Sequence, residues 1–261
     1  MCILFDLDGV FYEGDKPIDG GHEVISWVQQ NKIRHLFITN TTSRPRQALL
    51  EKLERFNIYT DKSHIITPAV AAAHWLREND YRNIALYIPE VTHCEFSDFN
   101  ICMNTTDNID AVIIGDLGES WDFKTLNRAF QQLMNKQAPQ LLALGMTRYW
   151  KSSIGLQLDV APFVVALEHA ADTKALVLGK PAVSFYETAI QMLSCPKEEI
   201  FMIGDDINGD IAGSQNAGAK GVLVKTGKFR PKDLNRGIKP VAVLDSIKAF
   251  PEWWNRSKLI C

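Results

Sequence analysis

The feature that most constrains the fold of this chain is the alternation of short apolar runs with helical patterns. Runs that predict β-strands lie at residues 3–7, 36–39, 176–178, 200–203 and 221–224. Helical spacing appears between them, for example at Leu49, Leu53 and Phe56. Thr67 and Pro68 predict the start of a further helix, because a hydroxyl N-cap and a proline at the first helical position both favour one. The alternation predicts an α/β fold built on a doubly wound parallel sheet.

The middle of the chain interrupts this pattern. Residues 79–175 have their own expected strands, at 84–88, 111–114 and 141–144, and their own expected helices, at 123–134 and 162–170. An insertion of roughly a hundred residues has the size of a domain. We therefore expect a core formed by residues 1–78 and 176–261, with an inserted α/β domain at 79–175.

Composition and charge narrow the class of protein. A hydrophobic share of 46% with 23% charged residues is typical of a soluble globular protein. The formal net charge of -3 and the absence of a basic run argue against a nucleic-acid partner. No apolar stretch is long enough to span a bilayer, and Asp6 comes too early for a signal peptide, so we expect a cytoplasmic protein without a membrane partner.

The cysteines indicate no particular site. Their positions are Cys2, Cys94, Cys102, Cys195 and Cys261. Because they are odd in number, widely spaced and form no CxxC pair, the sequence predicts neither a disulfide framework nor a zinc site.

Polar side chains follow four of the expected strands. In chain order the residues at these strand ends are Asp6 and Asp8, Thr39 and Asn40, Lys180 after Gly179, and Asp205, Asp206 and Asp210. Ligands of open parallel sheets bind beyond the carboxyl ends of the strands, so we expect these groups in one crevice. Two carboxylates about 4 Å apart repel by about 4 kcal/mol at an effective dielectric near 20, so the cluster needs a cation or raised pKa values. Oxygen ligands without histidine or cysteine favour Mg²⁺ or Mn²⁺.

Each stretch also has a plainer interpretation. "DLDG" at Asp6 is common as a turn, "TNTTS" as a helix cap, and Lys180 before a proline as a solvated side chain. "GDDINGD" resembles a calcium loop, but the required glycine and glutamate would fall on Ile211 and Ala217. The occurrence of all four stretches, each at a strand end, favours a shared site.

Together the four motifs resemble those of the haloacid dehalogenase superfamily of phosphatases. The matching residues are Asp6, Asp8, Gly9 and Val10 in the first motif, Thr39 and Asn40 in the second, Lys180 in the third, and Asp205 with Asp210 in the fourth. The insertion resembles the α/β cap of subfamily IIA, which contains the NagD-like nucleotide phosphatases and pyridoxal phosphate phosphatase. Within it, "ALGMTRYWKSSIGLQLDVAPFVVALEHA" is most similar to the group of the phospholysine phosphohistidine inorganic pyrophosphate phosphatase.

The resemblance implies a Mg²⁺-dependent phosphatase with a Rossmann-like core. Asp6 would attack phosphorus and form an aspartyl-phosphate, and Asp8 would serve as general acid and then general base. Asp6, Asp8 and Asp205 would hold the Mg²⁺, Asp8 through its backbone carbonyl. The role of Asp206 is left open.

The resemblance also implies which residues bind the phosphoryl group. Thr39 and Asn40 would hydrogen-bond its oxygens, and Lys180 would neutralise its charge. Asp210 would orient Lys180 or a metal-bound water. Gly9 would let backbone amides approach the phosphate closely.

Two departures from the subfamily leave the substrate open beyond the class of small phosphorylated compounds. Thr41 stands where many members have asparagine, and residues 146–149 replace a Thr-Asn-x-Asp stretch of the NagD-like members. Arg148 is a candidate substrate contact, together with Tyr149, Trp150 and Lys151, although an ordinary strand explains this stretch equally well. A homodimer formed through the cap is a further expectation.

Three alternatives to a phosphatase share this fold or these motifs. Haloalkanoate dehalogenases of the superfamily use the aspartate nucleophile without Mg²⁺ and without a second aspartate, so the presence of Asp8 favours phosphate chemistry. A phosphotransferase on the same fold and a non-catalytic scaffold both stay open.

Overall fold

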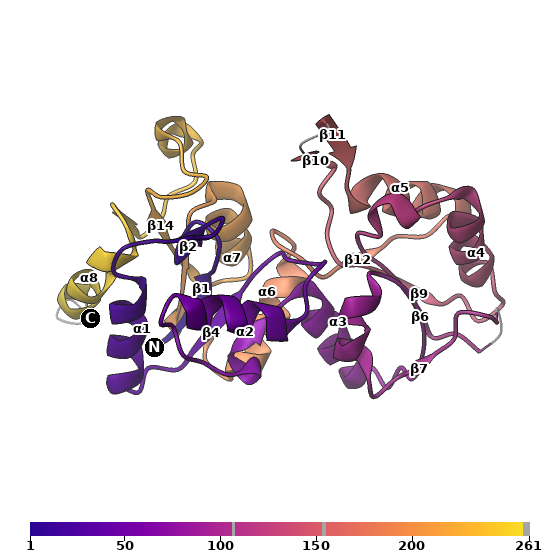
Figure 1. Cartoon of the computed structure of the whole chain (residues 1–261), viewed down its shortest axis with the longest axis horizontal. Helices are drawn as coiled ribbons and strands as arrows, with labels where there is room; N and C mark the ends of the chain where they lie inside the picture. Colours follow the sequence, from indigo (N-terminus) through magenta and orange to yellow (C-terminus); the bar gives the residue numbers. More distant parts are fainter. Residues whose placement is uncertain (106–107, 153–154, 258–261) are drawn as a thin grey trace. The chain divides into compact units, whose positions relative to one another are not determined.

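Two parallel sheets organise the chain, one in each of two units. The computed structural model describes residues 1–105, 108–152 and 155–257. The first unit comprises Met1–Thr39, Arg46–Ile66 and Lys180–Cys261, and the second comprises Asn40–Pro45 and Thr67–Gly179 (Figure 1). The predicted α/β class is confirmed, because the strands of each sheet are parallel and helices connect successive strands.

The first unit contains a six-stranded sheet in the order β15-β14-β13-β1-β4-β5. Its strands are β1 (Cys2–Asp6), β4 (His35–Ile38), β5 (Ile65–Ile66), β13 (Ile200–Gly204), β14 (Lys220–Val224) and β15 (Ala242–Leu244). The chain starts at β1, moves outward to β5, and returns at β13 on the other side of β1. The connections that follow β1 and β13 therefore diverge, which makes the carboxyl ends of these two strands the topological switch point of the sheet.

Apolar residues on both faces of this sheet explain why it lies in the interior of the first unit. Every residue of β1 is buried, and Ile3, Phe5, Phe37 and Ile203 belong to one apolar cluster. The helices described in this unit are α1 (Gly21–Gln30), α2 (Arg46–Arg55), α6 (Val183–Leu193), α7 (Gly213–Asn216) and α8 (Phe250–Ser257). A short hairpin is formed by β2 (Tyr12–Glu13) and β3 (Lys16–Pro17). A sheet buried on both faces needs continuous apolar strands, and the sequence supplies them.

The second unit contains a five-stranded parallel sheet in the order β12-β9-β8-β6-β7. Its strands are β6 (Asn83–Tyr87), β7 (Asn100–Ile101), β8 (Ala111–Ile114), β9 (Gln140–Ala143) and β12 (Leu176–Val177), and its helices are α3 (Pro68–Glu78), α4 (Phe123–Leu133) and α5 (Val160–Ala171). The antiparallel hairpin of β10 (Tyr149–Ser152) and β11 (Gly155–Leu158) also belongs to this unit. The chain leaves β6 for β7 on one side and then crosses to β8 on the other, so this sheet is doubly wound as well.

Most of the predicted elements are present. The strands expected at 84–88, 111–114 and 141–144 are β6, β8 and β9, and the helices expected at 123–134 and 162–170 are α4 and α5. The Thr67 hydroxyl accepts a hydrogen bond from the Val70 N–H at 3.3 Å, as an N-cap of α3 should. None of the helices within the described ranges has the length and apolar character that crossing a bilayer requires.

One strand was assigned to the wrong sheet. Residues 176–178 were expected in the core sheet, but Leu176 and Val177 pair with Leu142 and Ala143 of β9. A short apolar run has the same pattern in either sheet, so the sequence could not distinguish them. The second unit comprises Thr67–Gly179 besides Asn40–Pro45, and within it α3 packs on the short helix η2 (Glu90–Phe96). The bounds 79–175 of an inserted domain stay a prediction.

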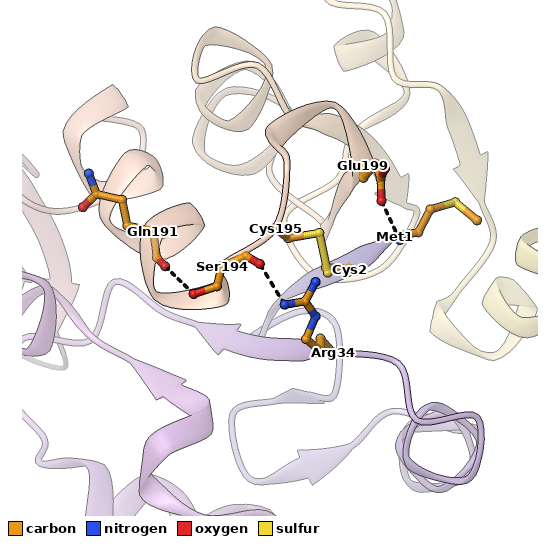
Figure 2. The surroundings of a disulfide bond; sticks show 7 residues. All are labelled: Met1, Cys2, Arg34, Gln191, Ser194, Cys195 and Glu199. Atoms are coloured by element: carbon orange, nitrogen blue, oxygen red, sulfur yellow. Dashed lines mark hydrogen bonds and ion pairs between the residues drawn. A yellow bond between two sulfur atoms is a disulfide. The ribbon is translucent and has the colours of Figure 1, made fainter.

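The cysteine interpretation also needs correction, because Cys2 and Cys195 form a disulfide. Cys2 is the first residue of β1 and Cys195 lies just after α6; their Cα atoms are 6.6 Å apart, and both side chains are buried. Figure 2 shows Arg34 beside the bridge, where its guanidinium donates to the Ser194 carbonyl at 2.7 Å. The two cysteines are 193 residues apart in the sequence, so no local pattern predicts that they pair. The fold brings the two segments together.

Candidate active site

A buried lysine joins two buried carboxylates in the first unit. Asp6 is the last residue of β1, and the Lys180 Nζ lies 2.7 Å from Asp6 Oδ1 and 2.8 Å from Asp210 Oδ1. The exposed fractions of Asp6, Lys180 and Asp210 are 5%, 8% and 0%. Because buried charges are stable only when they are paired, the Lys180 ammonium holds the two carboxyl groups in place on either side of it. Lys180 reaches the cluster from the segment after β12, a strand of the other sheet.

Asp210 is held by two further hydrogen bonds. It lies in the single π-helical turn η5 (Ile207–Ala212), which follows β13. Its Oδ2 accepts the backbone N–H groups of Asp205 at 3.1 Å and Asp206 at 3.0 Å. With Oδ1 on Lys180 and Oδ2 on the backbone, Asp210 positions the lysine and the loop that carries Asp205.

Asp205 is the carboxylate with spare capacity. It is 1% exposed, and its Oδ2 accepts the Lys228 backbone N–H at 2.6 Å. Its Oδ1 is buried and has no hydrogen-bond partner among the residues that the structure describes. Gly9 and Gly227 both have positive φ, of 84° and 58°, and a Cβ on either would lie 2.0 Å from Asp205 Oδ2. Only glycine permits this approach to Asp205, and the approach of backbone amides to a phosphate at Gly9 stays a prediction.

Burial shifts the protonation of the cluster. It raises the pKa of Asp6 to about 8, and the negative charge of Asp210 adds to the effect while Lys180 opposes it. Burial also raises the pKa of Asp205 to about 6, although the Lys228 N–H acts in the other direction. A cation bound by Asp6 and Asp205 would favour the charged forms of these carboxyl groups, which burial disfavours.

The donor set fits a small hard cation. Asp6, Asp205 and Asp210 each present one carboxylate oxygen, and these three oxygens lie within 4.8 Å of one another. Both Asp210 oxygens already accept hydrogen bonds, whereas Asp205 Oδ1 is buried without one within the described part of the chain. An oxygen-only set with one unsatisfied buried carboxylate oxygen fits a hard cation such as Mg²⁺.

The other predicted residues of the first motifs lie outside this cluster. The Asp8 side chain is exposed, and its backbone forms a bridge with Tyr12. Thr39 follows β4 and is buried, with its N–H donating to the Ile66 carbonyl at 3.1 Å. Asn40 is exposed and belongs to the second unit.

Asp206, whose role the sequence left open, caps the turn η5. Its Oδ1 accepts the backbone N–H groups of Asn208 and Gly209, each at 2.9 Å. Burial acts to raise the pKa of Asp206, but these hydrogen bonds and the nearby Lys228 hold it below its ordinary value. Asp206 is therefore a structural carboxylate of the loop.

The candidate residues of the second unit lie on the β10–β11 hairpin. Arg148 is exposed directly before β10, and its guanidinium carbon lies 5.8 Å from the centre of the Tyr149 ring. Tyr149 and Trp150 are about half exposed, at 51% and 48%. The side chain of Lys151 lies outside the part of the chain that the structure describes.

The residues that follow β14 also contact the site, although the sequence did not predict them. The Thr226 hydroxyl donates to the Gly9 carbonyl, and Lys228 contacts Asp205 through its backbone and approaches Asp206 to 3.7 Å through Nζ. These residues also follow a first-sheet strand, so reading the end of β14 in the same way as the other strands would have found them.

Comparisons with known proteins agree with this geometry. Residues 3–102 match the haloacid dehalogenase-like hydrolase family, and residues 177–250 match a family described as HAD-hydrolase-like. The phospholysine phosphohistidine inorganic pyrophosphate phosphatase of Homo sapiens is 37% identical over 88% of this chain and 85% of its own length. The haloacid dehalogenase-like hydrolase domain-containing protein 2 of Bos taurus is 37% identical over 96% of this chain and 93% of its own length. The chain belongs to the haloacid dehalogenase-like hydrolase family.

Two solved structures have the same fold as this chain. The p-nitrophenyl phosphatase from Archaeoglobus fulgidus superposes with a TM-score of 0.85 at 23% identity, covering 96% of this chain and 98% of that chain. NagD from Escherichia coli K-12 superposes with a TM-score of 0.83 at 20% identity, covering 95% and 96%. The prediction of a haloacid dehalogenase phosphatase is confirmed, and the chain is a hydrolase of phosphate bonds.

Proposed function

We propose that this phosphatase removes the phosphoryl group of a small phosphorylated compound through an aspartyl-phosphate on Asp6. The observation that carries the proposal is the buried Asp6, which is fixed by Lys180 and lies within 4.8 Å of the unsatisfied carboxylate Asp205. A carboxylate held in one orientation attacks phosphorus without an entropic cost at the moment of reaction. Covalent catalysis then divides one difficult displacement into two easier ones.

Lys180 and Asp210 act together in this scheme. Lys180 is buried and its pKa is raised well above the ordinary range; burial acts against the charged form, but the charges of Asp210 and Asp6 outweigh it. The lysine is therefore a permanent positive charge beside the nucleophile. It stabilises the charge that develops on the phosphoryl oxygens, and Asp210 keeps it in place.

Asp8 is the proposed general acid and base. Its position two residues after Asp6 puts it on the same turn, and its exposed side chain can exchange protons with solvent. It would protonate the leaving oxygen in the first step and accept a proton from the attacking water in the second. Thr39 and Asn40 are the proposed hydrogen-bond donors to the phosphoryl oxygens.

Asp6, Asp205 and the Asp8 backbone carbonyl are the proposed ligands of Mg²⁺. The bound ion would supply charge neutralisation between the attacking carboxylate and the phosphoryl oxygens. Activity should vanish in excess EDTA and return with Mg²⁺. Ca²⁺ should not restore it, because its larger and more flexible coordination shell would misplace the in-line geometry.

The substrate is proposed by class, and a panel of compounds tests it. The panel contains p-nitrophenyl phosphate, inorganic pyrophosphate, phospholysine and phosphohistidine, together with sugar phosphates and nucleotides, each assayed with Mg²⁺. The human relative's name motivates the second, third and fourth compounds. The proposal predicts Mg²⁺-dependent phosphate release from at least one of them, and release from none would contradict it.

A homodimer formed through the second unit and a cytoplasmic location both stay predictions. Light scattering of the purified chain tests the first, and fractionation of cells that express it tests the second.

A further inference from the structure

Residues 226–228, which follow β14 and which we call the β14 loop, hydrogen-bond three other segments of the first unit. The first residue, Thr226, donates its hydroxyl to the Gly9 carbonyl in the turn after β1. The second donates its backbone N–H to the Glu13 carboxylate of β2 at 2.7 Å. The third donates its backbone N–H to Asp205 Oδ2 at 2.6 Å. One short loop therefore joins the turn after β1, the β2–β3 hairpin and the turn after β13 (Figure 1).

The bond to Asp205 leaves one carboxylate oxygen for a cation. Oδ2 accepts the Lys228 N–H, whereas Oδ1 is buried and has no hydrogen-bond partner in the part of the chain that the structure describes. Gly227 makes the contact possible, because its φ is 58° and a Cβ there would lie 2.0 Å from Asp205 Oδ2. A backbone donor on one oxygen fixes the rotation of the carboxylate. The β14 loop thus sets the direction in which the other oxygen of Asp205 points.

The β14 loop also fixes the peptide that follows Asp8. The Gly9 N–H donates to the Tyr12 carbonyl at 2.7 Å, and the Gly9 carbonyl accepts the Thr226 hydroxyl, so this glycine is held at both ends. The peptide bond between Asp8 and Gly9 is trans and planar, so the Asp8 carbonyl points opposite to the Gly9 N–H and away from Tyr12. Bonds made by the residue after Asp8 therefore determine the direction of a proposed Mg²⁺ ligand.

Strand β2, which accepts two of these contacts, is itself anchored on the first unit. Tyr12 is 4% exposed, and the Lys52 Nζ lies 3.8 Å from the centre of its ring. The Phe56 ring lies 5.7 Å from the same ring. The next residue, Glu13, is exposed, and its carboxylate accepts the Gly227 N–H. Glu13 thereby holds the middle of the β14 loop against a strand that packing keeps in place.

We propose that the β14 loop positions the Mg²⁺ ligands of the first unit, with Thr226 and Glu13 as its positioning residues. Thr226 acts through Gly9 on the Asp8 carbonyl. Glu13 acts through the backbone of the β14 loop on Asp205. The inference rests on the proposed Mg²⁺-dependent function and adds to it two residues that act only through others. Residues that orient metal ligands in this way typically contribute about 10- to 100-fold to metal affinity.

Calorimetric titration of the full, metal-free chain with Mg²⁺ tests the proposal. The test variant is Thr226→Val, which removes the hydroxyl and keeps the branched shape, and Thr226→Ser restores the hydroxyl. The matched control is Thr188→Val, because the Thr188 hydroxyl of α6 also donates to a backbone carbonyl, that of Ser184, at 2.9 Å. Asp205→Asn is the reference for a lost site. The unfolding temperature in EDTA reports the stability of each variant, so a loss of Mg²⁺ affinity can be separated from a loss of stability.

The expected result is that Thr226→Val weakens Mg²⁺ binding by about tenfold and that Thr226→Ser recovers it to within about threefold. Thr188→Val should bind Mg²⁺ like the unmodified chain, within about twofold, whatever its unfolding temperature. With p-nitrophenyl phosphate, the Mg²⁺ concentration that gives half the maximal rate should rise in Thr226→Val as Kd does. The kcat at saturating Mg²⁺ should stay within about threefold, because the bound ion restores the arrangement of its ligands.

Glu13 is tested with two substitutions. Glu13→Gln keeps an acceptor oxygen and loses the charge, whereas Glu13→Ala loses both. Glu13→Ala should weaken Mg²⁺ binding by about three- to tenfold, and Glu13→Gln by about twofold at most, because the amide oxygen can still accept the Gly227 N–H. Equal losses in the two variants would show that Glu13 acts through its charge and would overturn its role as a positioning residue.

Unchanged Mg²⁺ affinity in Thr226→Val, or a loss that Thr188→Val matches, would overturn the proposal. The proposed function would then stand as long as Asp205→Asn still loses Mg²⁺ binding. If the unmodified chain binds no Mg²⁺ and is fully active in EDTA, the proposed Mg²⁺ site and this inference both fail.

Discussion

The two units share one plan, a doubly wound parallel sheet, but their switch points contain opposite kinds of residues. In the first unit, the ends of β1 and β13 contribute Asp6 and Asp205, and a buried lysine joins the set. In the second, β6 ends in Tyr87, and Arg128 on α4 lines the space beyond it. The comparison shows that the winding order decides where a ligand can bind, and that the side chains at the strand ends decide what can happen there.

The largest effect is expected at the first switch point. Asp6→Asn removes the proposed nucleophile and keeps the shape of the side chain, so kcat should fall by at least about a thousandfold. The matched control is Asp206→Asn, because Asp206 accepts backbone hydrogen bonds of the same loop and an asparagine oxygen can still accept them. The control should retain kcat within about tenfold. Steady-state kinetics on p-nitrophenyl phosphate would contradict the assignment if Asp6→Asn kept more than a few per cent of kcat.

A second prediction is that the first unit carries out the chemistry and the second unit recognises the leaving group of the substrate. Arg148 is exposed beside Tyr149 on the hairpin of the second unit. If it contacts the leaving group, Arg148→Ala should cost about 1.5–3 kcal/mol, or about 10- to 150-fold in kcat/KM, on the best substrate of the panel. The loss on p-nitrophenyl phosphate should be small, because that compound engages the site mainly through its phosphoryl group. An unchanged preference between the two compounds would leave this hairpin without a role in recognition.

The disulfide makes a third difference between the units. Cys2 and Cys195 both belong to the first unit, whereas Cys94 and Cys102 of the second are free. Because the bridge closes a long loop, its loss through Cys2→Ala should destabilise the oxidised chain by about 2–5 kcal/mol. Cys94→Ala is the matched control and should have little effect. A reductant should lower the unfolding temperature of the unmodified chain and of Cys94→Ala, and equal temperatures with and without reductant would show that the bridge adds nothing.

The smallest expected effect concerns the pH dependence of stability without metal. The pKa of Asp6 is raised to about 8 in the folded chain from an ordinary value of 3.8, so its proton stabilises the fold. That contribution is complete below pH 3.8 and is lost as the pH rises through 8. In EDTA, Asp6→Asn should therefore unfold roughly 3–6 °C above the unmodified chain at pH 8.5 and show a much smaller difference at pH 5. A difference that does not change between these pH values would contradict the shift.

The sequence predicted the parts of the site that follow strands of the first sheet. Asp6 and Asp205 each come at the end of a run of buried apolar residues. The apolar run predicts the strand, and its end places the carboxylate at the carboxyl edge of the sheet. Lys180 and Asp210 were also predicted from the expected strand ends, and the family resemblance implied that Asp210 orients Lys180; in the fold the two side chains are in contact at 2.8 Å. Lys180 follows β12, which pairs with β9 in the sheet of the second unit. The sequence could not predict this pairing, because a short apolar run does not specify its partner strand.

Other features depend on contacts between distant segments, which spacing cannot reveal. The Cys2–Cys195 bridge joins residues near opposite ends of the chain. The approach of Gly9 and Gly227 to Asp205 requires three separate loops to meet. The ring stack of Tyr87, Trp121 and Phe163 joins residues of three different segments. Each of these is a property of the packed fold.

The most direct test of the central claim, that Asp6 is the nucleophile of the first switch point, is to trap the covalent intermediate. The chain is mixed with Mg²⁺ and its best substrate, quenched in acid within the first turnovers, digested, and analysed by mass spectrometry. We predict that the peptide containing Asp6 gains the mass of one phosphoryl group, that fragmentation places it on Asp6, and that hydroxylamine removes it. A phosphoryl group on any other residue, or hydrolysis at full rate with no phosphorylated Asp6 at any quench time, would contradict the account.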